Sequence, residues 1–409
     1  MPTSTSLGPD SLLRRMFSPT GRTDPYPWYA QLRECAPVHR TATGTYVFSR
    51  YADAASIARD PAFAVKDAAW FDAHTPHWRS SAGMRLFGAA MLFCNGSDHL
   101  RVRKVMSAAF TPQRLHELEH LVRGITGQRL EALGRLAADG RCVDLHALLT
   151  LPLPLAVACT LTGVPAQDSG WVYELVQPLL ALLDPYVDTR ALERCDTAAA
   201  ALRPYLSALL AERRRRPGDD LASQLARAQA AGRLTQDESE AALTLAMAAG
   251  FETTTVLLDH AISALMADPG QSAAVAEDPR AAAAAVEETL RHDPPVQLFT
   301  RIARRDTAVG DLPVKAGQEV LVLLAAAHRD PERFPEPDAF DLRRDTGQLL
   351  SFGGGAHYCL GAVLARMEAR VILPALFRRF PGLRAAGPPQ SNHRITMRGW
   401  TTLPVTLGP

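Results

Sequence analysis

The chain contains 409 residues, of which 47% are hydrophobic and 21% are charged. Its 44 Lys and Arg residues nearly balance its 43 Asp and Glu residues, which leaves a formal net charge of +1. This balance argues against a protein that binds nucleic acid or a membrane surface through bulk charge. At about 150 residues per domain the length allows two or three domains, or one large domain, with a core that needs no disulfides.

The six cysteines are scattered and form no CxxC pair, so neither a disulfide framework nor a structural zinc site is expected. The first residues contain no apolar stretch of signal-peptide length. The longer apolar runs, Leu243–Phe251 and Val320–Ala327, are shorter than the roughly 18 residues that a membrane span requires. We therefore expect a soluble, cytoplasmic protein that contacts neither membrane nor nucleic acid.

In chain order, the predicted elements are mostly helical over roughly the first 290 residues. The first exception is Pro37–Arg50, where alternating residues flank a Thr43-Gly44 turn and predict a β-hairpin. Helices are then predicted over residues 98–110 and 112–138.

A capping box marks the start of a long apolar helix. Thr235 is followed three residues later by Glu238, which predicts Thr235 as the N-cap of a helix that runs past Asp259. A further helix is predicted over Pro279–His292, because two prolines follow it and cannot continue it.

Short strands and Pro-rich coil are predicted over Val296–Leu350, and a final long helix begins near Cys359. No repeat and no low-complexity linker divides the chain. The layout therefore favours a single, mainly α domain with small β-sheets.

The segment FGGGAHYCLG, residues 352–361, combines a run of glycines with a cysteine. Glycines let the backbone approach a flat ligand, and free N–H groups at a helix start stabilise a thiolate, which is a soft ligand for iron. Three alternatives compete with this interpretation. In the first, the segment is a plain loop and Cys359 is a small buried residue. In the second, the glycines bind phosphate, although no GK[ST] sequence follows them. In the third, Cys359 is a nucleophile and His357 is its base, although side chains two residues apart rarely face each other.

This segment resembles the haem-binding signature FxxGxHxCxG of the cytochrome P450 haem-thiolate monooxygenases, with matches at Phe352, Gly355, His357, Cys359 and Gly361. The resemblance implies haem b (protohaem IX) with Cys359 as the ligand of the iron and the other four residues around the cofactor. It covers the chain from roughly Asp24 onward. It therefore implies one haem-thiolate domain over 24–409 after an N-terminal extension over 1–23, with the family's triangular prism of helices and small sheets.

Glu288 and Arg291 are three residues apart on a predicted helix, so their side chains share a face and can pair. Alone, such a pair is usually a solvated surface contact. In the family it is buried and joined by an arginine from downstream coil. The candidates are Arg333, in the string PERF, and Arg344, which lies closer to the cysteine and is favoured. The implied role of this trio is structural.

The centre of the long helix reads AGFETT, residues 249–254, and resembles the family's oxygen-activating motif. Glycine and successive threonines are poor choices for a helix interior, and threonine hydroxyls that bond back to carbonyls can open a helix locally. The alternative is a buried helix with back-bonded threonines. The resemblance implies that Thr253 donates a hydrogen bond during oxygen activation and that Glu252 relays protons.

Four basic residues resemble the family's ligands for the haem propionates. His99 and Arg103 are four residues apart on a predicted helix and can bind one carboxylate together. Arg301 matches the strand arginine for the other propionate, and His357 assists. Each residue alone would be an exposed charge. Residues 95–98 replace the Pro-rich lead-in of the family, so the path of that loop departs from its pattern.

The resemblance implies that electrons come from a separate ferredoxin and ferredoxin reductase, because one such domain leaves no room for a reductase. Arg101 and Lys104 are candidate contacts for an acidic ferredoxin. Residues 70–93 are expected to form a loop over the substrate. The pocket residues implied by family position are mostly apolar: Leu245, Ala249, Val296, Leu298, Phe299 and Met397.

These features predict hydroxylation or epoxidation, with O₂, of a mostly apolar small molecule. A polyketide or peptide intermediate of secondary metabolism, such as antibiotic biosynthesis, is the expected substrate. The alternatives are oxidative coupling or ring formation, a peroxygenase, a non-catalytic haem-thiolate sensor and a colourless cysteine hydrolase. A sensor has no need for the pair Glu252 and Thr253, and a peroxygenase can dispense with it, so the presence of the pair favours a monooxygenase. Oxidative coupling is not excluded by the sequence.

Overall fold

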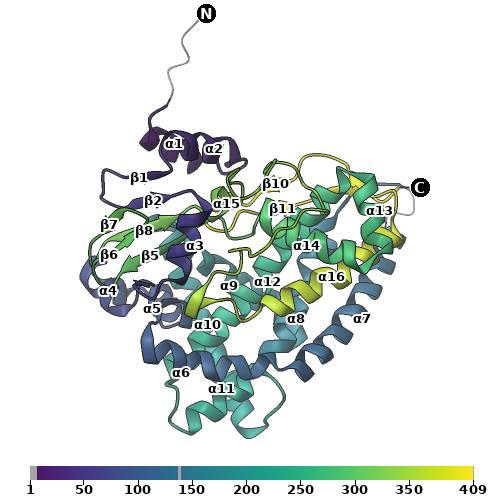
Figure 1. Ribbon diagram of the computed structural model, residues 1–409. Coiled ribbons are helices and arrows are strands. Elements are labelled where there is room, and N and C mark those ends of the chain that lie inside the picture. The colour runs from purple at the N-terminus through teal and green to yellow at the C-terminus, as the bar shows by residue number, and fades with distance from the viewer. Residues whose placement is uncertain (1–6, 137–139, 409) are drawn as a thin grey trace, which may run out of the picture. The chain divides into compact units, whose positions relative to one another are not determined.

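Figure 1 shows a mainly helical chain with several small β-sheets in the computed structural model, which describes residues 7–136 and 140–408. The chain divides into two compact units, each built from separated stretches. Unit one comprises Met1–Ala64, Ala284–Cys359 and Gln390–Trp400; unit two comprises Val65–Ala283, Leu360–Pro389 and Thr401–Pro409. The single domain over 24–409 stays a prediction, and residues 1–6 of the predicted extension lie outside the described residues.

The helices of unit one are short apart from α14, whose first residues belong to unit two. They are α1 (Pro9–Met16), α2 (Tyr26–Cys35), α3 (Tyr51–Arg59), α14 (Pro279–His292), α15 (Leu324–Ala327) and the 3₁₀ turn η7 (Gly355–His357). The observed bounds of α14 confirm the helix predicted from its flanking prolines. Helix α1, within the predicted extension, buries Leu12, Leu13 and Met16 in the core of unit one.

Unit one contains a five-stranded sheet in the order β1-β2-β8-β5-β3, in which β2 and β8 are parallel and the other pairs are antiparallel. Its strands are β1 (Val38–Arg40), β2 (Tyr46–Phe48), β3 (Phe63–Ala64), β5 (Phe299–Ala303) and β8 (Glu319–Val322). A separate hairpin pairs β6 (Thr307–Val309) with β7 (Leu312–Val314). The β1–β2 pair confirms the hairpin predicted over Pro37–Arg50, with Gly44 in the turn at φ +93°.

Unit two holds the long helices. They are α4 (Ala68–His74), α5 (Ala82–Gly88), α6 (Gly96–Ser107), α7 (Pro112–Leu136), α8 (Pro152–Thr162), α9 (Ser169–Leu179), α10 (Thr189–Arg215), α11 (Leu221–Ala230), α12 (Gln236–Met266), α13 (Pro269–Glu277) and α16 (Ala362–Arg379). Short turns of other helix types are η1 (Trp78–Ser80), η2 (Met91–Phe93), η3 (Ala108–Phe110), η4 (His146–Thr150), η5 (Ala166–Asp168) and η6 (Leu180–Leu183).

The strands of unit two form one sheet in the order β4-β12-β9, from β4 (Val143–Asp144), β12 (Pro404–Thr406) and β9 (Arg384–Ala385). Strand β10 (Gln390–Ser391) lies in the last stretch of unit one, and strand β11 (Trp400–Thr402) begins at the end of that stretch and continues into the last stretch of unit two. Helix α6 begins two residues before its predicted start, and η3 completes the predicted range to Phe110. The predicted end of α7 at residue 138 lies outside the described residues.

Helix α12 is the central element of unit two and packs against α8, α16 and α5 (Figure 1). The predicted capping box is confirmed, since Thr235 and Glu238 exchange side-chain and backbone hydrogen bonds at its start. By length and composition α12 could cross a membrane, although its uninterrupted apolar run, Leu243–Phe251, is short. However, 72% of its apolar window is buried inside the protein, and packing there accounts for its apolar composition.

Candidate functional site

The cysteine loop of unit one is closed by its own backbone. The N–H of Cys359 donates to the carbonyl of Phe352 at 2.9 Å, and the Cys359 side chain is exposed. An exposed thiol does not fit the alternative in which Cys359 is a small buried residue. Helix α16 starts three residues after Cys359, which confirms the predicted helix start, with Gly361 as its N-cap and His357 in the preceding turn η7.

The glycines of this loop also have a structural role that sequence analysis did not predict. Gly353 and Gly355 have φ values of +74° and +59°, a region that favours residues without a Cβ. A Cβ on Gly354 would lie 3.0 Å from the carbonyl oxygen of Ala58 at the end of α3. The glycines therefore let the loop lie against α3, in addition to any approach to a flat ligand.

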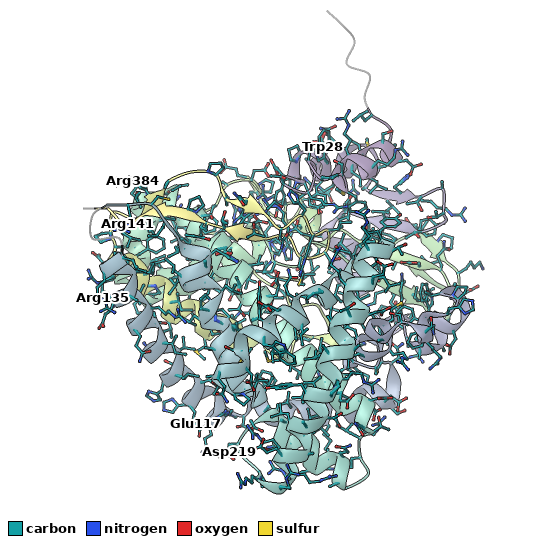
Figure 2. The ribbon with its side chains drawn as sticks, turned by 180° about the vertical axis from the view of Figure 1, so that it is seen from behind. Trp28, Glu117, Arg135, Arg141, Asp219 and Arg384 are labelled. Carbon is teal, nitrogen blue, oxygen red and sulfur yellow. The ribbon has the colours of Figure 1, made fainter. Side chains whose placement is uncertain are left out.

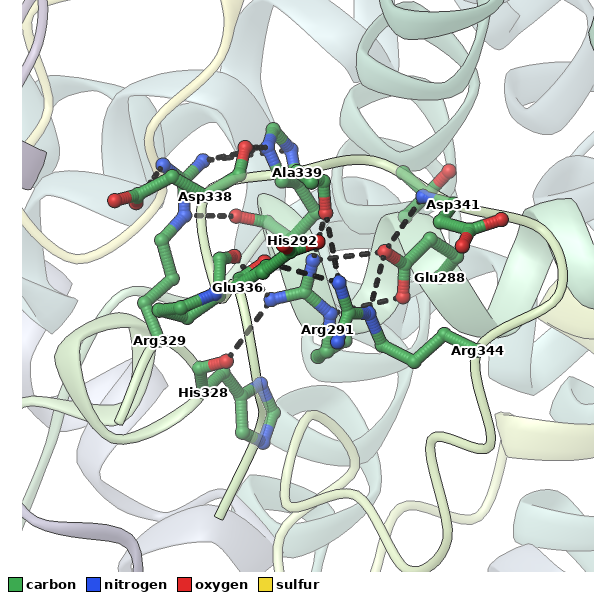
Figure 3. A network of polar contacts seen from close by, with 12 residues as sticks. Glu288, Arg291, His292, His328, Arg329, Glu336, Asp338, Ala339, Asp341 and Arg344 are labelled. Atoms are coloured by element: carbon green, nitrogen blue, oxygen red, sulfur yellow. Dashed lines mark hydrogen bonds and ion pairs between the residues drawn. The ribbon is translucent and has the colours of Figure 1, made fainter. Parts of the chain in front are cut away.

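The carboxylate of Glu288 is the centre of a buried network in unit one (Figure 3). Arg291 donates to both of its oxygens at 2.8 Å, and Nε of Arg344 donates to Oε1 at 3.1 Å. The backbone N–H of Asp341 is a further donor to Oε1 at 3.0 Å. The structure thus brings Glu288, Arg291 and Arg344 together, with the first two side chains at most 1% exposed.

Arg291 also holds the downstream coil. Its guanidinium donates to the carbonyls of His328, Pro337 and Ala339 at 3.2, 2.6 and 2.8 Å (Figure 3). Arg333, the other candidate for the trio, lies instead over the rings of Tyr51 and Phe334 at 5.4 and 4.9 Å. Arginine stacking on aromatic faces accounts for the position of Arg333 without a carboxylate.

Arg301 of β5 is a partly buried cation. Its Nη1 donates to the carbonyl of Thr300 at 2.8 Å, and its guanidinium lies 4.7 Å from the centre of the Phe299 ring. Among residues 7–136 and 140–408, no carboxylate pairs with it. Burial lowers the pKa of Arg301 to about 10, because the charged form has lost solvation. An anionic group beside Arg301 would restore the lost stabilisation.

In unit two, His99 and Arg103 both lie on α6, and His99 is only 2% exposed. Burial, and then the positive charge of Arg103, lowers the pKa of His99. That electrostatic effect agrees with the four-residue spacing, which puts both side chains on one face of the helix. His99 is therefore neutral at neutral pH, and its ring is suited to donate one N–H to an acceptor.

Glu252 and Thr253 lie in the middle of α12, where almost all neighbouring residues are buried. Ala249 is exposed and Thr253 partly exposed, so an uncovered stripe runs along this part of the helix, next to Glu252, which is 9% exposed. The hydroxyl of Thr253 donates to the carbonyl of Ala249 at 2.8 Å.

Helix α12 runs without a break across this motif, from Gln236 to Met266. The hydroxyl of Thr253 is bonded back to the helix, which both interpretations of the motif predict. Gly250 has a packing role, since a Cβ there would lie 3.2 Å from Cβ of Ala158 on α8.

The predicted pocket residues occupy different environments. Leu245 and Ala249 lie four residues apart on α12. In unit one, Val296 and Met397 pair through an isolated antiparallel β-bridge, and Phe299 lies beneath Arg301. Leu298 belongs to the buried core cluster that includes Leu12 and Leu32, so packing alone accounts for its apolar side chain.

Sequence analysis missed a buried polar cluster in unit two. Asp259 of α12 is fully buried; its Oδ2 accepts from Nδ1 of His146 at 2.8 Å, and its Oδ1 accepts from the hydroxyl of Thr150. The backbone N–H of His146 donates to Asp144 at 3.1 Å, which orients the turn η4. The signal in the sequence was a lone Asp259 in an apolar stretch, about two turns before the C-terminal end of α12. No motif in the sequence names a partner for it.

Burial lowers the pKa of His146, but the hydrogen bond and charge of Asp259, with smaller effects of Asp144 and Glu252, outweigh burial and raise it overall. The stability contributed by this raised pKa is therefore fully present below the ordinary histidine value of about 6.5 and is lost as pH rises through the folded-state value. We expect His146→Gln to lower the free energy of unfolding more at about pH 6 than at about pH 9.

Urea unfolding of the wild type and His146→Gln across this pH range measures the difference. The matched control is His77→Asn, which changes an exposed histidine of the same unit and should show no such pH trend. A deficit that is equal at both pH values would mean that protonation of His146 contributes nothing to the pair.

Comparisons with known proteins agree with the cysteine loop. The family model described as cytochrome P450 matches residues 61–400. The putative cytochrome P450 140 of Mycobacterium tuberculosis is 35% identical over 413 residues, which cover 98% of this chain and 93% of that protein. The vitamin D(3) 25-hydroxylase of Pseudonocardia autotrophica is 37% identical over 408 residues, or 96% of each chain. Ligand-free CYP164A2 of Mycobacterium smegmatis has a TM-score of 0.86 at 39% identity, covering 97% of this chain and 99% of that chain.

The chain therefore belongs to the cytochrome P450 family. It is a cytochrome P450 monooxygenase whose cofactor is a haem held by a thiolate. Two features of unit one suit that group: the exposed thiol of Cys359, and the partly buried Arg301, to which a haem carboxylate would supply the anion.

Proposed function

We propose that the Cys359 thiolate binds haem b and that the enzyme hydroxylates or epoxidises a mostly apolar small molecule. The observation that carries this proposal is the exposed Cys359 in a closed loop that matches the family signature. When bound, haem supplies the activation of O₂ and the oxidation of a C–H or C=C bond. The residues of the chain bind and orient this group, exclude water and move protons.

Four basic residues are proposed to bind the haem carboxylates. Two of them are Arg301, which lacks a carboxylate partner among the described residues, and His357. The other two are His99 and Arg103, on one face of α6. Phe352, Gly355 and Gly361 are proposed to shape the loop around the thiolate.

Glu252 and Thr253 are proposed to bring protons to the reacting oxygen. The partly exposed Thr253 on the uncovered stripe of α12 supports this role, because its hydroxyl can exchange the bond to the Ala249 carbonyl for a bond to another group. Glu252, the next residue, can release and regain a proton.

We expect Thr253→Ala to bind substrate and consume NAD(P)H through the coupled reductase system, with more peroxide and less product per electron pair. Peroxide and product are quantified together. The control is Thr160→Ala, which removes an equivalent hydroxyl that bonds back to Ala156 at 2.9 Å on α8. If Thr253→Ala formed as much product per NAD(P)H consumed as the wild type, Thr253 would have no role in proton delivery.

The proposed substrate class is apolar, and we extend it to intermediates of secondary metabolism such as polyketides or peptides. The exposed Ala249 on the stripe of α12, with the buried Leu245 one turn before it, supports an apolar ligand. The relative from Pseudonocardia autotrophica, a vitamin D(3) 25-hydroxylase by name, also acts on a largely apolar molecule.

The test begins with the absorption spectrum of the dithionite-reduced protein under carbon monoxide, where a strongly red-shifted Soret band establishes thiolate ligation. Fatty acids, steroids and macrolides are then titrated in, and compounds that shift the spin state of the haem are taken forward as candidate substrates. Product mass separates the reactions: the gain of one oxygen atom supports the proposal, whereas the loss of two hydrogens supports oxidative coupling.

Ferredoxin and ferredoxin reductase are the proposed electron donors, and the cytoplasm is the proposed location. Lys104 is exposed on α6 and suits an acidic partner. Arg101, the other predicted contact, is already engaged, since it pairs with Glu238 at 2.6 Å and Asp98 at 3.0 Å. Arg101 thereby ties α6 to the first turn of α12, and we assign the docking role to Lys104.

A further inference from the structure

Two exposed histidines of unit two, His116 and His120, form a pair on helix α7. Their spacing of four residues places both rings on one face of the helix. Nε2 of one ring lies 3.1 Å from Nε2 of the other, and the ring centres are 4.6 Å apart. Figure 2 labels the adjacent Glu117 at the surface of the molecule.

The separation of the two nitrogens matches that of two ligands on one metal ion. With metal–nitrogen bonds of about 2.1 Å, a separation of 3.1 Å corresponds to a nitrogen–metal–nitrogen angle of about 95°. That angle is near the value for neighbouring ligands in square-planar or octahedral geometry, which Cu²⁺ and Ni²⁺ adopt with imidazole. The alternative is a hydrogen bond between two neutral rings, in which one donates and the other accepts.

The charges around the pair do not oppose a cation. Arg114 is paired with Glu117 at 2.9 Å and also donates to the carbonyl of Thr160. Arg123 is paired with Glu119 at 2.6 Å. Each guanidinium beside the histidines is therefore balanced by a carboxylate on the same helix.

The site differs from a structural zinc centre, which needs four protein ligands. In the part of the chain that the structure describes, no group of three or more His, Cys, Asp or Glu residues is placed to hold a metal ion. Water would fill the remaining coordination positions of an ion on His116 and His120.

We propose that His116 and His120 bind one divalent transition-metal ion, Cu²⁺ or Ni²⁺, through their Nε2 atoms. The site contains none of the residues proposed to hold the haem, and it needs no substrate. Bound metal bridges two successive turns of α7 and stabilises the folded state by mass action, because the unfolded chain does not hold the two rings together.

The test uses untagged holoenzyme treated with a chelator, and NiCl₂ as the probe. Isothermal titration at about pH 7.5 is expected to show one Ni²⁺ per chain, and His116→Gln and His120→Gln should each weaken binding at least about tenfold. The control His77→Asn should bind like the wild type. The red-shifted carbon monoxide spectrum verifies that every variant is folded and loaded with haem.

A second readout is the thermal midpoint, which Ni²⁺ should raise in the wild type and in His77→Asn but not in the two glutamine variants. Absence of Ni²⁺ binding to the wild type, or equal binding by wild type and both glutamine variants, overturns the proposal. In the first case the pair is only a hydrogen bond, and in the second case the ion lies elsewhere.

Discussion

Cys359→Ser is expected to abolish the red-shifted carbon monoxide spectrum and to reduce monooxygenase activity to background. A serine hydroxyl stays protonated at neutral pH, whereas a cysteine can supply the thiolate that donates electron density to the iron. The loop itself should persist, because the N–H of residue 359 still donates to the carbonyl of Phe352. The measurement is the reduced spectrum with carbon monoxide, followed by turnover.

Cys35→Ser is the matched control, since Cys35 is another exposed cysteine of unit one, at the end of α2. It should keep both spectrum and activity. If Cys359→Ser retained a thiolate spectrum, another cysteine would be the ligand, and the assignment of Cys359 would be wrong.

Glu288→Ala is expected to produce the largest loss of stability, about 3–5 kcal/mol in the free energy of unfolding. The substitution leaves Arg291 and Arg344 without their shared carboxylate, and Arg291 is fully buried. An unpaired buried charge costs more than the pair contributes, so the coil that holds Ala339 and Asp341 should loosen as well. Urea unfolding and the yield of haem-loaded protein measure the effect.

Arg343→Ala provides the control for this cluster. Arg343 is the neighbour of Arg344 and pairs with Asp341 at 3.0 Å, but its side chain is 91% exposed. Exposed pairs contribute little, so this variant should unfold close to the wild type. If Glu288→Ala and Arg343→Ala lowered the free energy of unfolding equally, the buried network would contribute no more to stability than an exposed ion pair.

The elements with local signals were predictable from the sequence. The capping box at Thr235 and the prolines around α14 act within a few residues, and both helices have the predicted starts. The Thr43-Gly44 turn specified its hairpin for the same reason. Such signals depend on backbone geometry and are independent of the rest of the chain.

Contacts between distant residues were not predictable in this way. His146 and Asp259 are 113 residues apart, and neither carries a local pattern that names the other. The choice between Arg333 and Arg344 rested on resemblance, whereas the geometry depends on where the coil places each guanidinium relative to Glu288. The contact of Gly354 with Ala58 of α3 likewise joins residues that are far apart in the sequence, so no local pattern predicts it.

The interleaved course of the chain has a consequence for how the protein is made. Each unit takes its last stretch from beyond residue 389: Gln390–Trp400 for unit one and Thr401–Pro409 for unit two. A ribosome releases the chain from its N-terminal end, so neither unit has all of its parts until these residues have emerged. Synthesis that stalls near residue 380 should therefore leave both units incomplete and open to cellular proteases, and no single cut in the gene separates one whole unit from the other.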